Sequence, residues 1–251
     1  MDFDLTDDQR LLKDSVDRLI ADRYDFEQRK KARTEKDGWS RAMWAQFAEL
    51  GLLGLPFAEE HGGFGGGPVE TMIVMEAFGR GLVLEPFLAT VILGGGLVRR
   101  LGSAAQQDAL LPQVAAGKLL LAFAHVERFS RYDLSDVQAT ATRAGDGWVL
   151  NGEKSVVLHG DCADKLLVTA RTAGGRHDRA GIGLFLVDAA AAGVSRKGYA
   201  TQDGLRAAEV AFANAPAEAV LGDPGGALPG GERVVDEAIA AICAEAVGLM
   251  Q

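Results

Sequence analysis

The spacing of the apolar residues changes near Lys118, and this change constrains the fold more than any other feature of the sequence. Before Lys118, apolar residues recur at helical spacing in several segments. After it, short apolar runs and alternating stretches such as Val137, Ala139 and Ala141 are separated by glycine-containing turns. Beyond residue 226 the helical spacing returns. The sequence therefore predicts a set of helices, then a β-domain, then a further helix.

The helical part carries clear start signals. Capping boxes are expected at Thr6–Gln9 and Ser103–Gln106. In a capping box the side chains of the first and fourth residues each accept a hydrogen bond from the other's backbone amide. Ser40 is a further N-cap, and Pro68 suits the first turn of a helix. Another helix is expected from Pro86 to Leu101. These signals place helices along most of the first 117 residues.

The β-domain is expected to be an antiparallel sheet, as a barrel or sandwich, because no helical pattern separates its strands. Strands are expected within Leu119–Val126, Lys165–Arg171, Ile182–Val187 and Glu209–Phe212. Turns are expected at residues 145–147 and at Asn151-Gly152, the latter followed by Glu153 and Lys154 as solvated charges.

The expected class is α+β, with an N-terminal helical domain at residues 1–117, a middle β-domain at 118–225 and a C-terminal helical segment at 226–251. The last helix has no stop signal before Gln251, which favours a truncated helical bundle or a chain end that packs on a partner. Its apolar residues are expected to share one face, which has nothing to pack against if the helix is isolated: Val234, Val235, Ala238, Ile239, Ile242, Ala246 and Leu249.

Composition excludes several classes of function. A net charge of −9 argues against binding to nucleic acid, which needs a basic face. The most apolar stretch, Gly81–Val98, is broken by a glutamate, a proline and three glycines, so no membrane span is expected. The N-terminal MDFDLTDDQR does not resemble a signal peptide, and the two cysteines form no close pair. We therefore expect a cytoplasmic protein.

Two further features of the sequence have the composition of a binding site. The glycine-rich segment Glu59–Gly67 has the composition of a phosphate-binding loop, but it lacks a Gly-Lys-Ser/Thr ending and a preceding strand. A glycine-permitted turn between helices is the favoured interpretation. The four histidines are scattered and no residues show metal-binding spacing, so no metal site is expected.

Several segments, in the same order along the chain, resemble the acyl-CoA dehydrogenase family. They are Phe3–Arg10, Leu50–Pro56 with Glu59–Gly63, Leu111–Lys118, Leu150–Lys154 as a Leu-Asn-Gly-x-Lys hairpin, Gly204–Ala207 with Val210 and Phe212, and Gly248–Gln251. The resemblance covers the N-terminal and middle domains and the start of the C-terminal domain. It is nearest to the small subunits of heteromeric enzymes such as pimeloyl-CoA dehydrogenase.

The resemblance implies an oxidoreductase of fatty acid metabolism that uses FAD. In the family a carboxylate removes the α proton of an acyl-CoA thioester while the β hydride passes to the flavin. An electron-transfer acceptor and a homo- or hetero-oligomer, dimer or tetramer, are implied as partners. Two alternatives stay open: a non-catalytic partner subunit of a heteromeric enzyme, and an oligomerisation scaffold without flavin.

The resemblance also assigns candidate site residues. Flavin contacts are expected from Phe123, His125, Val126, Val156 and Leu158. Substrate contacts are expected from Glu127, Arg128, Arg131 and Ser135, because arginine suits the phosphates of CoA. The departures are informative. Val126 replaces a threonine, and residues 156–158 replace a Trp-Ile-Thr segment, which removes two hydroxyls and an aromatic ring from the flavin face.

The catalytic base is not identified by the sequence. The family position in the first C-terminal helix aligns with Ala238, and Glu237 is a weak candidate one residue away, rotated by about 100°. A solvated surface glutamate is the alternative interpretation of Glu237.

Overall fold

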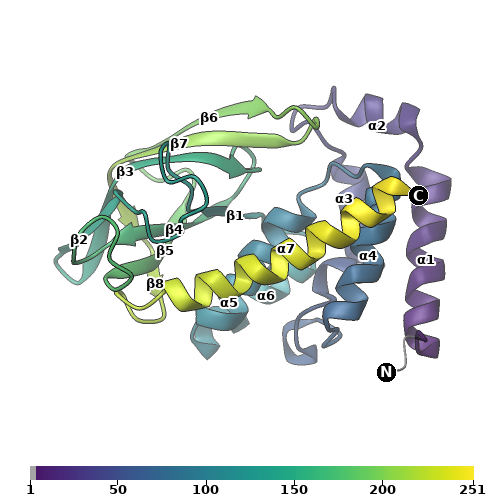
Figure 1. The fold of residues 1–251 in the computed structure, drawn as a ribbon, viewed down its shortest axis with the longest axis horizontal. Helices are drawn as coiled ribbons and strands as arrows, with labels where there is room; N and C mark the ends of the chain where they lie inside the picture. Colours follow the sequence, from purple (N-terminus) through teal and green to yellow (C-terminus); the bar gives the residue numbers. More distant parts are fainter. Residues whose placement is uncertain (1–3) are drawn as a thin grey trace.

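The computed structural model describes residues 4–251, so Phe3 lies outside the described residues. Figure 1 shows helices at one end of the molecule, strands at the other, and α7 running from the strands back across the helices. This confirms the α+β class, with an N-terminal helical part, a middle β-sheet and a C-terminal helix. The α-helices are α1 (Asp7–Arg23), α2 (Phe26–Ala32), α3 (Arg41–Glu49), α4 (Pro68–Gly81), α5 (Gly96–Leu101), α6 (Ala104–Ala115) and α7 (Leu228–Met250).

The predicted helix starts are confirmed. Thr6 and Ser103 form capping boxes with Gln9 and Gln106, Ser40 caps α3, and Pro68 opens α4. The helix expected from Pro86 to Leu101 differs, because it begins as a π-helical stretch, η3 (Leu88–Gly95), and only then continues as α5. Short 3₁₀ turns, η1 (Leu52–Gly54) and η2 (Glu59–His61), connect α3 to α4.

The glycine-rich connection before α4 packs as a turn. A Cβ on Gly63 would lie 2.1 Å from the carbonyl oxygen of Phe57, so only glycine fits against this backbone. The segment thus has a packing reason for its glycines.

The strands are β1 (Leu121–Ala124), β2 (Thr140–Ala144), β3 (Gly147–Leu158), β4 (Lys165–Arg171), β5 (Ile182–Asp188), β6 (Val194–Ala200), β7 (Arg206–Ala217) and β8 (Ala219–Leu221). They form one sheet in the order β6-β7-β3-β2-β4-β5-β8, with β1 paired to β4. Most pairs are antiparallel as expected, but β1 and β2 each pair with β4 in parallel. The sequence did not predict β6 or β8.

The turn expected at Asn151-Gly152 is wrong. The chain turns at residues 145–146, and β3 continues through Gly152, which has φ +137° at a shift of register against β7. A Cβ on Gly152 would lie 2.7 Å from Ala139 Cα, so the glycine permits close backbone packing here. Because the strand continues, Lys154 is buried instead of solvated, whereas Glu153 is exposed.

Helix α7 packs on α4 through small residues. A Cβ on Gly79 would lie 1.9 Å from the Glu245 carbonyl oxygen, and one on Gly248 would lie 1.9 Å from the Glu76 carbonyl oxygen. The two glycines therefore let the helix backbones touch. The face that packs includes Val234, Ala238, Ala241, Ala244 and Gly248.

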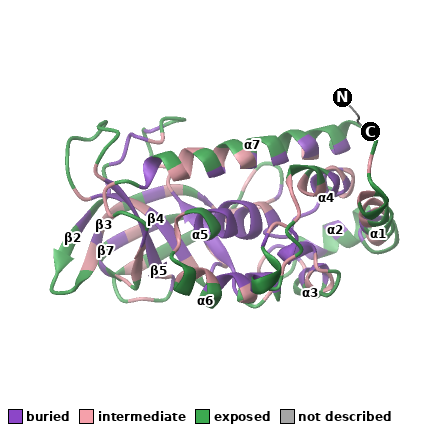
Figure 2. Ribbon diagram, turned by 90° about the horizontal axis from the view of Figure 1, so that it is seen from below, coloured by how far each residue is buried: buried purple, intermediate pink, exposed green. Residues whose placement is uncertain are grey.

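The expected apolar face of the last helix is only partly buried. Val234 and Ala238 are buried within this chain, but Ile239, Ile242 and Leu249 are exposed. The contact through small residues rotates these larger side chains outward, and the outer side of α7 is largely exposed in Figure 2.

Candidate functional site

The end of β1 lies beside the end of β3, and this brings two predicted flavin residues together. The Ser155 amide donates to the Val126 carbonyl at 2.8 Å, so Val126 lies next to Val156. Leu158 follows two residues further along β3. We call these three residues, Val126 after β1 and Val156 and Leu158 at the end of β3, the β3 edge.

Val156 has an unusual backbone conformation for a β-branched residue. Its φ is +51°, and it lies in a register shift between Lys154 and Val157. The side chain is 47% exposed. A β-branched residue in the left-handed region is strained, and the surrounding structure must hold it there. The β3 edge therefore presents an exposed apolar side chain on a bulge.

Phe123 and His125 line a separate cavity, although His125 directly precedes Val126 in the chain. Their rings stack at 4.3 Å between centroids, and both line a cavity of about 10 Å³ against Leu97 and Leu228. Burial, and then the charge of Lys154, lowers the pKa of His125 to about 4. This cavity does not include the residues of the β3 edge.

Glu127 and Lys154 form a buried ion pair that the sequence did not predict. Lys154 Nζ donates to Glu127 Oε1 at 2.8 Å and to Thr169 Oγ1 at 3.1 Å, and its side chain is fully buried. Burial lowers the pKa of Lys154, and the Glu127 carboxylate opposes this shift. The Leu-Asn-Gly-x-Lys motif was the only signal in the sequence that pointed to this lysine.

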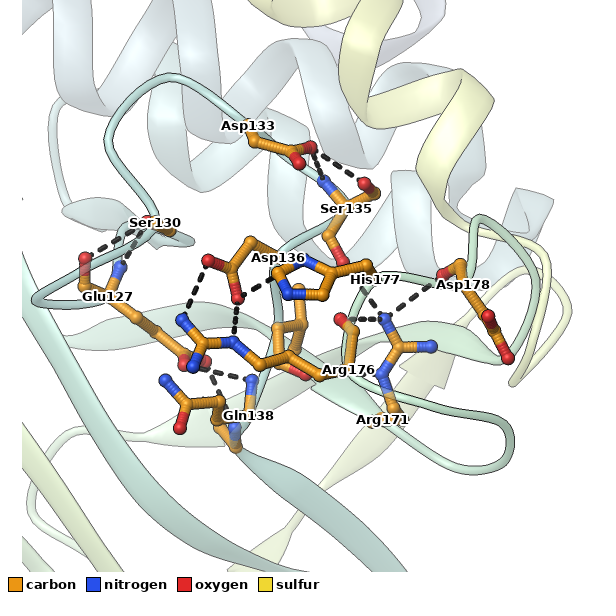
Figure 3. A network of polar contacts seen from close by, with 12 residues as sticks. Glu127, Ser130, Asp133, Ser135, Asp136, Gln138, Arg171, Arg176, His177 and Asp178 are labelled. Atoms are coloured by element: carbon orange, nitrogen blue, oxygen red, sulfur yellow. Dashed lines mark hydrogen bonds and ion pairs between the residues drawn. The ribbon is translucent and has the colours of Figure 1, made fainter.

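The Glu127 carboxylate is also bound by the backbone. Its two oxygens accept from the amides of Gln138 and Ala139, at 2.9 and 3.0 Å. Figure 3 shows the carboxylate turned inward beneath the loop that follows it. Glu127, a predicted substrate contact, uses its carboxylate within the protein to fix the start of this loop. We call Glu127, Lys154 and their partners the Lys154 cluster.

The loop between Glu127 and Asp136 is anchored at both ends and exposed at its tip. Arg128, Arg131, Phe129 and Tyr132 are all exposed, Tyr132 almost completely at 99%. Ser135, by contrast, is buried, and its hydroxyl donates to Asp133 at 2.7 Å. Of the polar residues expected to contact substrate, only the two arginines are presented to solvent.

Arg171 and Arg176 hold the far end of this loop (Figure 3). The Arg176 guanidinium forms a two-pronged ion pair with Asp136 and lowers the pKa of that carboxyl. Arg171 is buried and donates only to backbone carbonyls. Its acceptors are the carbonyls of Ser135, Val137, Ala173, Arg176, Asp178 and Ala180.

Glu237 does not lie at the β3 edge. Its carboxylate accepts hydrogen bonds from Arg99, at 3.1 Å, and from Arg100. It lines a groove of about 720 Å³ between α7, α4 and α5, and none of the predicted flavin residues lines this groove. The geometry thus favours a surface ion pair for this residue.

A different acidic residue of α7, Glu245, lines a cavity together with Leu158. This cavity, which we call the Leu158 cavity, also includes His159 and Glu85. Burial, and then the nearby Asp203, raises the pKa of Glu245. No pattern in the sequence indicates this arrangement, because it depends on how α7 is rotated on α4.

Comparison with known proteins identifies the family. Residues 6–118 match the acyl-CoA dehydrogenase N-terminal domain, and residues 122–215 match the acyl-CoA dehydrogenase middle domain. The chain belongs to the acyl-CoA dehydrogenase family. The long-chain specific acyl-CoA dehydrogenase of Rattus norvegicus mitochondria is 32% identical in an alignment of 201 positions that covers 73% of this chain and 44% of that protein. The chain thus spans less than half of this relative's length.

Solved structures of family members share the fold. A variant of the Tcur3481-Tcur3483 steroid ACAD superposes with a TM-score of 0.84 and 31% identity, over 96% of this chain and 63% of that chain. The ChsE4-ChsE5 complex from Mycobacterium tuberculosis gives a TM-score of 0.86 and 25% identity, over 99% of this chain and 65% of the matched chain. Within residues 4–251, no helix is long and apolar enough to cross a membrane.

Proposed function

We propose that this acyl-CoA dehydrogenase family chain is a subunit for FAD-dependent α,β-dehydrogenation of an acyl-CoA thioester, with an electron-transfer protein as acceptor. One observation carries the proposal. The β3 edge lies at the end of the sheet where Leu158 also lines a cavity closed by α4 and α7. Apolar side chains beside a cavity where helices meet a sheet are a common setting for a cofactor and its substrate.

The residues at the β3 edge fit the apolar face of a flavin. Val156 is exposed, Val126 and Leu158 are half-buried, and no hydroxyl or amide side chain stands among the three. These side chains can pack against a flavin ring but cannot hydrogen-bond it, so its polar atoms would depend on backbone groups. When bound, FAD supplies the acceptor for the substrate's β hydride.

The loop tip supports recognition of the CoA part. Arg128 and Arg131 are exposed on a loop whose base is fixed by the Lys154 cluster and by Asp136 with Arg176. Arginine binds phosphate through two parallel hydrogen bonds, and a fixed loop base reduces the entropy lost on binding. In this proposal Ser135 and Glu127 position the loop and do not contact the substrate.

A second candidate function is that of a partner subunit in a heteromeric enzyme. The observation that favours it is the exposed apolar side of α7, where Ile239, Ile242, Val247 and Leu249 are 44–59% exposed. Contiguous exposed apolar surface marks sites of protein association. Burial of this side of α7 by another subunit, or by another copy of this chain, is consistent with the dimer or tetramer that the family resemblance implies.

Flavin absorption separates these functions. The chain is purified alone and together with the product of a neighbouring gene. Each preparation is titrated with FAD, and the absorption band of protein-bound flavin is measured. A band with the chain alone supports the first function, and a band only with the partner supports the second. If neither preparation binds FAD, the chain is a scaffold and both proposals fail.

A sharper version changes the β3 edge. Val126→Thr and Leu158→Thr restore two hydroxyls. If this chain holds the flavin itself, each recovered hydrogen bond contributes about 0.5–1.5 kcal/mol, so FAD affinity rises by roughly tenfold for the pair. If a partner packs on these positions instead, the hydroxyls are buried without partners and the melting temperature falls without tighter FAD binding. Val157→Thr, at a buried neighbouring position, is the matched control.

A further inference from the structure

The Leu158 cavity contains polar groups whose hydrogen bonding is incomplete. Its volume is about 40 Å³, and most of the side chains around it are apolar. Three titratable residues also line it: Glu85 from the connection after α4, His159 from the end of β3, and Glu245 from α7. The hydrogen-bond partners and charge of each residue determine what the cavity can bind.

Glu85 is fully engaged by the protein. One carboxylate oxygen accepts from the Tyr24 hydroxyl at 2.7 Å, and the other accepts from the Ser40 amide at 3.1 Å. Burial raises the pKa of Glu85. This residue therefore forms part of the cavity wall and joins α1 to the start of α3.

His159 is not satisfied by the protein. The residue is 4% exposed, and its Nδ1 is buried without a hydrogen-bond partner among residues 4–251. Burial lowers the pKa of His159 to about 4, so the ring is neutral near pH 7. A buried polar nitrogen without a partner is costly, and such groups in native proteins usually have a functional reason.

The Glu245 carboxylate is the second group in the cavity wall without a protein partner. It is partly buried, and within the described residues it forms no hydrogen bond or ion pair. Its position is firmly set, because the Glu245 carbonyl lies at the close contact of α7 with Gly79. Two residues from different elements, His159 and Glu245, thus line one small cavity, and each carries a polar group without a protein partner.

The geometry does not fit a metal ion, because no three His, Cys, Asp or Glu side chains in residues 4–251 are grouped to hold one. A volume of about 40 Å³ exceeds the 10–15 Å³ that one water needs, and it suits a hydroxyl with the carbon that bears it. We propose that the Leu158 cavity binds a hydroxyl group on the acyl part of the substrate, which donates to Glu245 and accepts from His159 Nδ1.

This inference rests on the proposed function, because it makes the cavity part of the acyl site. A hydroxyl satisfies both protein groups at once, whereas an unsubstituted alkyl chain displaces water and leaves both unpaired. The two groups therefore select for a hydroxylated acyl chain and against a plain one of the same length.

The test compares a hydroxyacyl-CoA with the unsubstituted acyl-CoA of the same length, by calorimetric titration of the full chain with FAD and any partner it requires. We expect the hydroxyacyl ligand to bind at least about tenfold more tightly, the scale of one hydrogen bond to a charged group. Glu245→Leu should remove this preference by weakening only the hydroxyacyl ligand. Glu245→Gln, which keeps an acceptor oxygen, should retain part of it, and Asp236→Asn, on the exposed side of α7, should leave it unchanged.

The outcomes distinguish the inference from the function. If both ligands bind equally and Glu245→Leu changes neither, the inference is overturned and the dehydrogenase proposal stands. A stronger preference for an aminoacyl-CoA would also overturn it, because the cavity would then select a cation. If no acyl-CoA binds at all, the proposed function itself fails. Melting temperatures of Glu245→Leu and Glu245→Gln establish that each variant is folded.

Discussion

The Lys154 cluster and the Leu158 cavity are only a few residues apart along β3, yet two polar groups of the cavity differ from those of the cluster in having no protein partner. In the cluster, Lys154 and Glu127 are matched by each other and by surrounding donors and acceptors. In the cavity, His159 Nδ1 and Glu245 are left without partners in the described chain. Fully satisfied buried networks fix a structure, whereas a buried polar group without a protein partner indicates a place that a water, an ion or a ligand completes.

The largest expected effect comes from breaking the cluster. Lys154→Met leaves the Glu127 carboxylate buried without its cation, and removing one partner of a buried pair costs about 3–5 kcal/mol. We expect the free energy of unfolding, measured by urea denaturation, to fall by about this amount. Lys165→Met, which removes an exposed pair with Glu218, should cost under about 1 kcal/mol. An equal fall in the free energy of unfolding in the two variants would contradict the view that the buried pair matters more than the exposed one.

Much of the fold could be predicted from sequence because its signals are local. Thr6, Ser40, Ser103 and Pro68 act within one turn of their helices, and β4 was predicted with its observed bounds. Gly152 was misassigned because a positive φ serves a turn and a strand irregularity equally. The distinction depends on Ala139, which lies against Gly152 from another strand.

The candidate site was less predictable because it depends on contacts between distant segments. The family resemblance named Val126 and Val156, and the structure places them side by side. Glu245 could not be predicted, because the rotation of α7 is set by Gly79 and Gly248 at the helix crossing. The same rotation places Glu237 against Arg99 and Arg100.

The second expected effect concerns pH and His159. The folded-state pKa is about 4, below the ordinary 6.5, because of burial and then Arg206, with Asp203 acting in the opposite direction. The unfolded state therefore takes up the proton first, and stability is lost as pH falls from about 6.5 to 4. The shift corresponds to on the order of 3 kcal/mol. His159→Gln should flatten the pH dependence of unfolding over this interval, and His177→Gln, at an exposed position, should not. A slope unchanged by His159→Gln would contradict the prediction.

The third effect is a gain in stability. Glu245→Leu removes an unpaired, partly buried carboxylate, and we expect the free energy of unfolding to rise by about 1 kcal/mol at pH 8. Because the folded-state pKa is raised, wild-type Glu245 is protonated more readily in the folded protein as pH falls. The gain should therefore shrink on acidification. Asp236→Leu, at an exposed position of α7, should change stability by under about 0.5 kcal/mol. A loss of stability in Glu245→Leu would show that the carboxylate has a structural partner.

The smallest effect tests whether the β3 edge, like the Leu158 cavity, contains a residue that lowers the free energy of unfolding. Val156 has φ +51° and is 47% exposed, so its strain is offset by little packing. Glycine relieves the left-handed strain of about 1–2 kcal/mol but costs about 0.5–1 kcal/mol of backbone entropy, so Val156→Gly should raise the free energy of unfolding by about 0.5–1 kcal/mol. Val157→Gly is the matched control, because this neighbour is 1% exposed and should lose more than about 2 kcal/mol. Thermal denaturation of both variants measures the contrast.

A Val156→Gly protein that is less stable than wild type would mean that the valine side chain contributes more packing than its exposure indicates. A more stable variant that binds FAD less tightly would show that the strained valine is kept for its contact with the flavin.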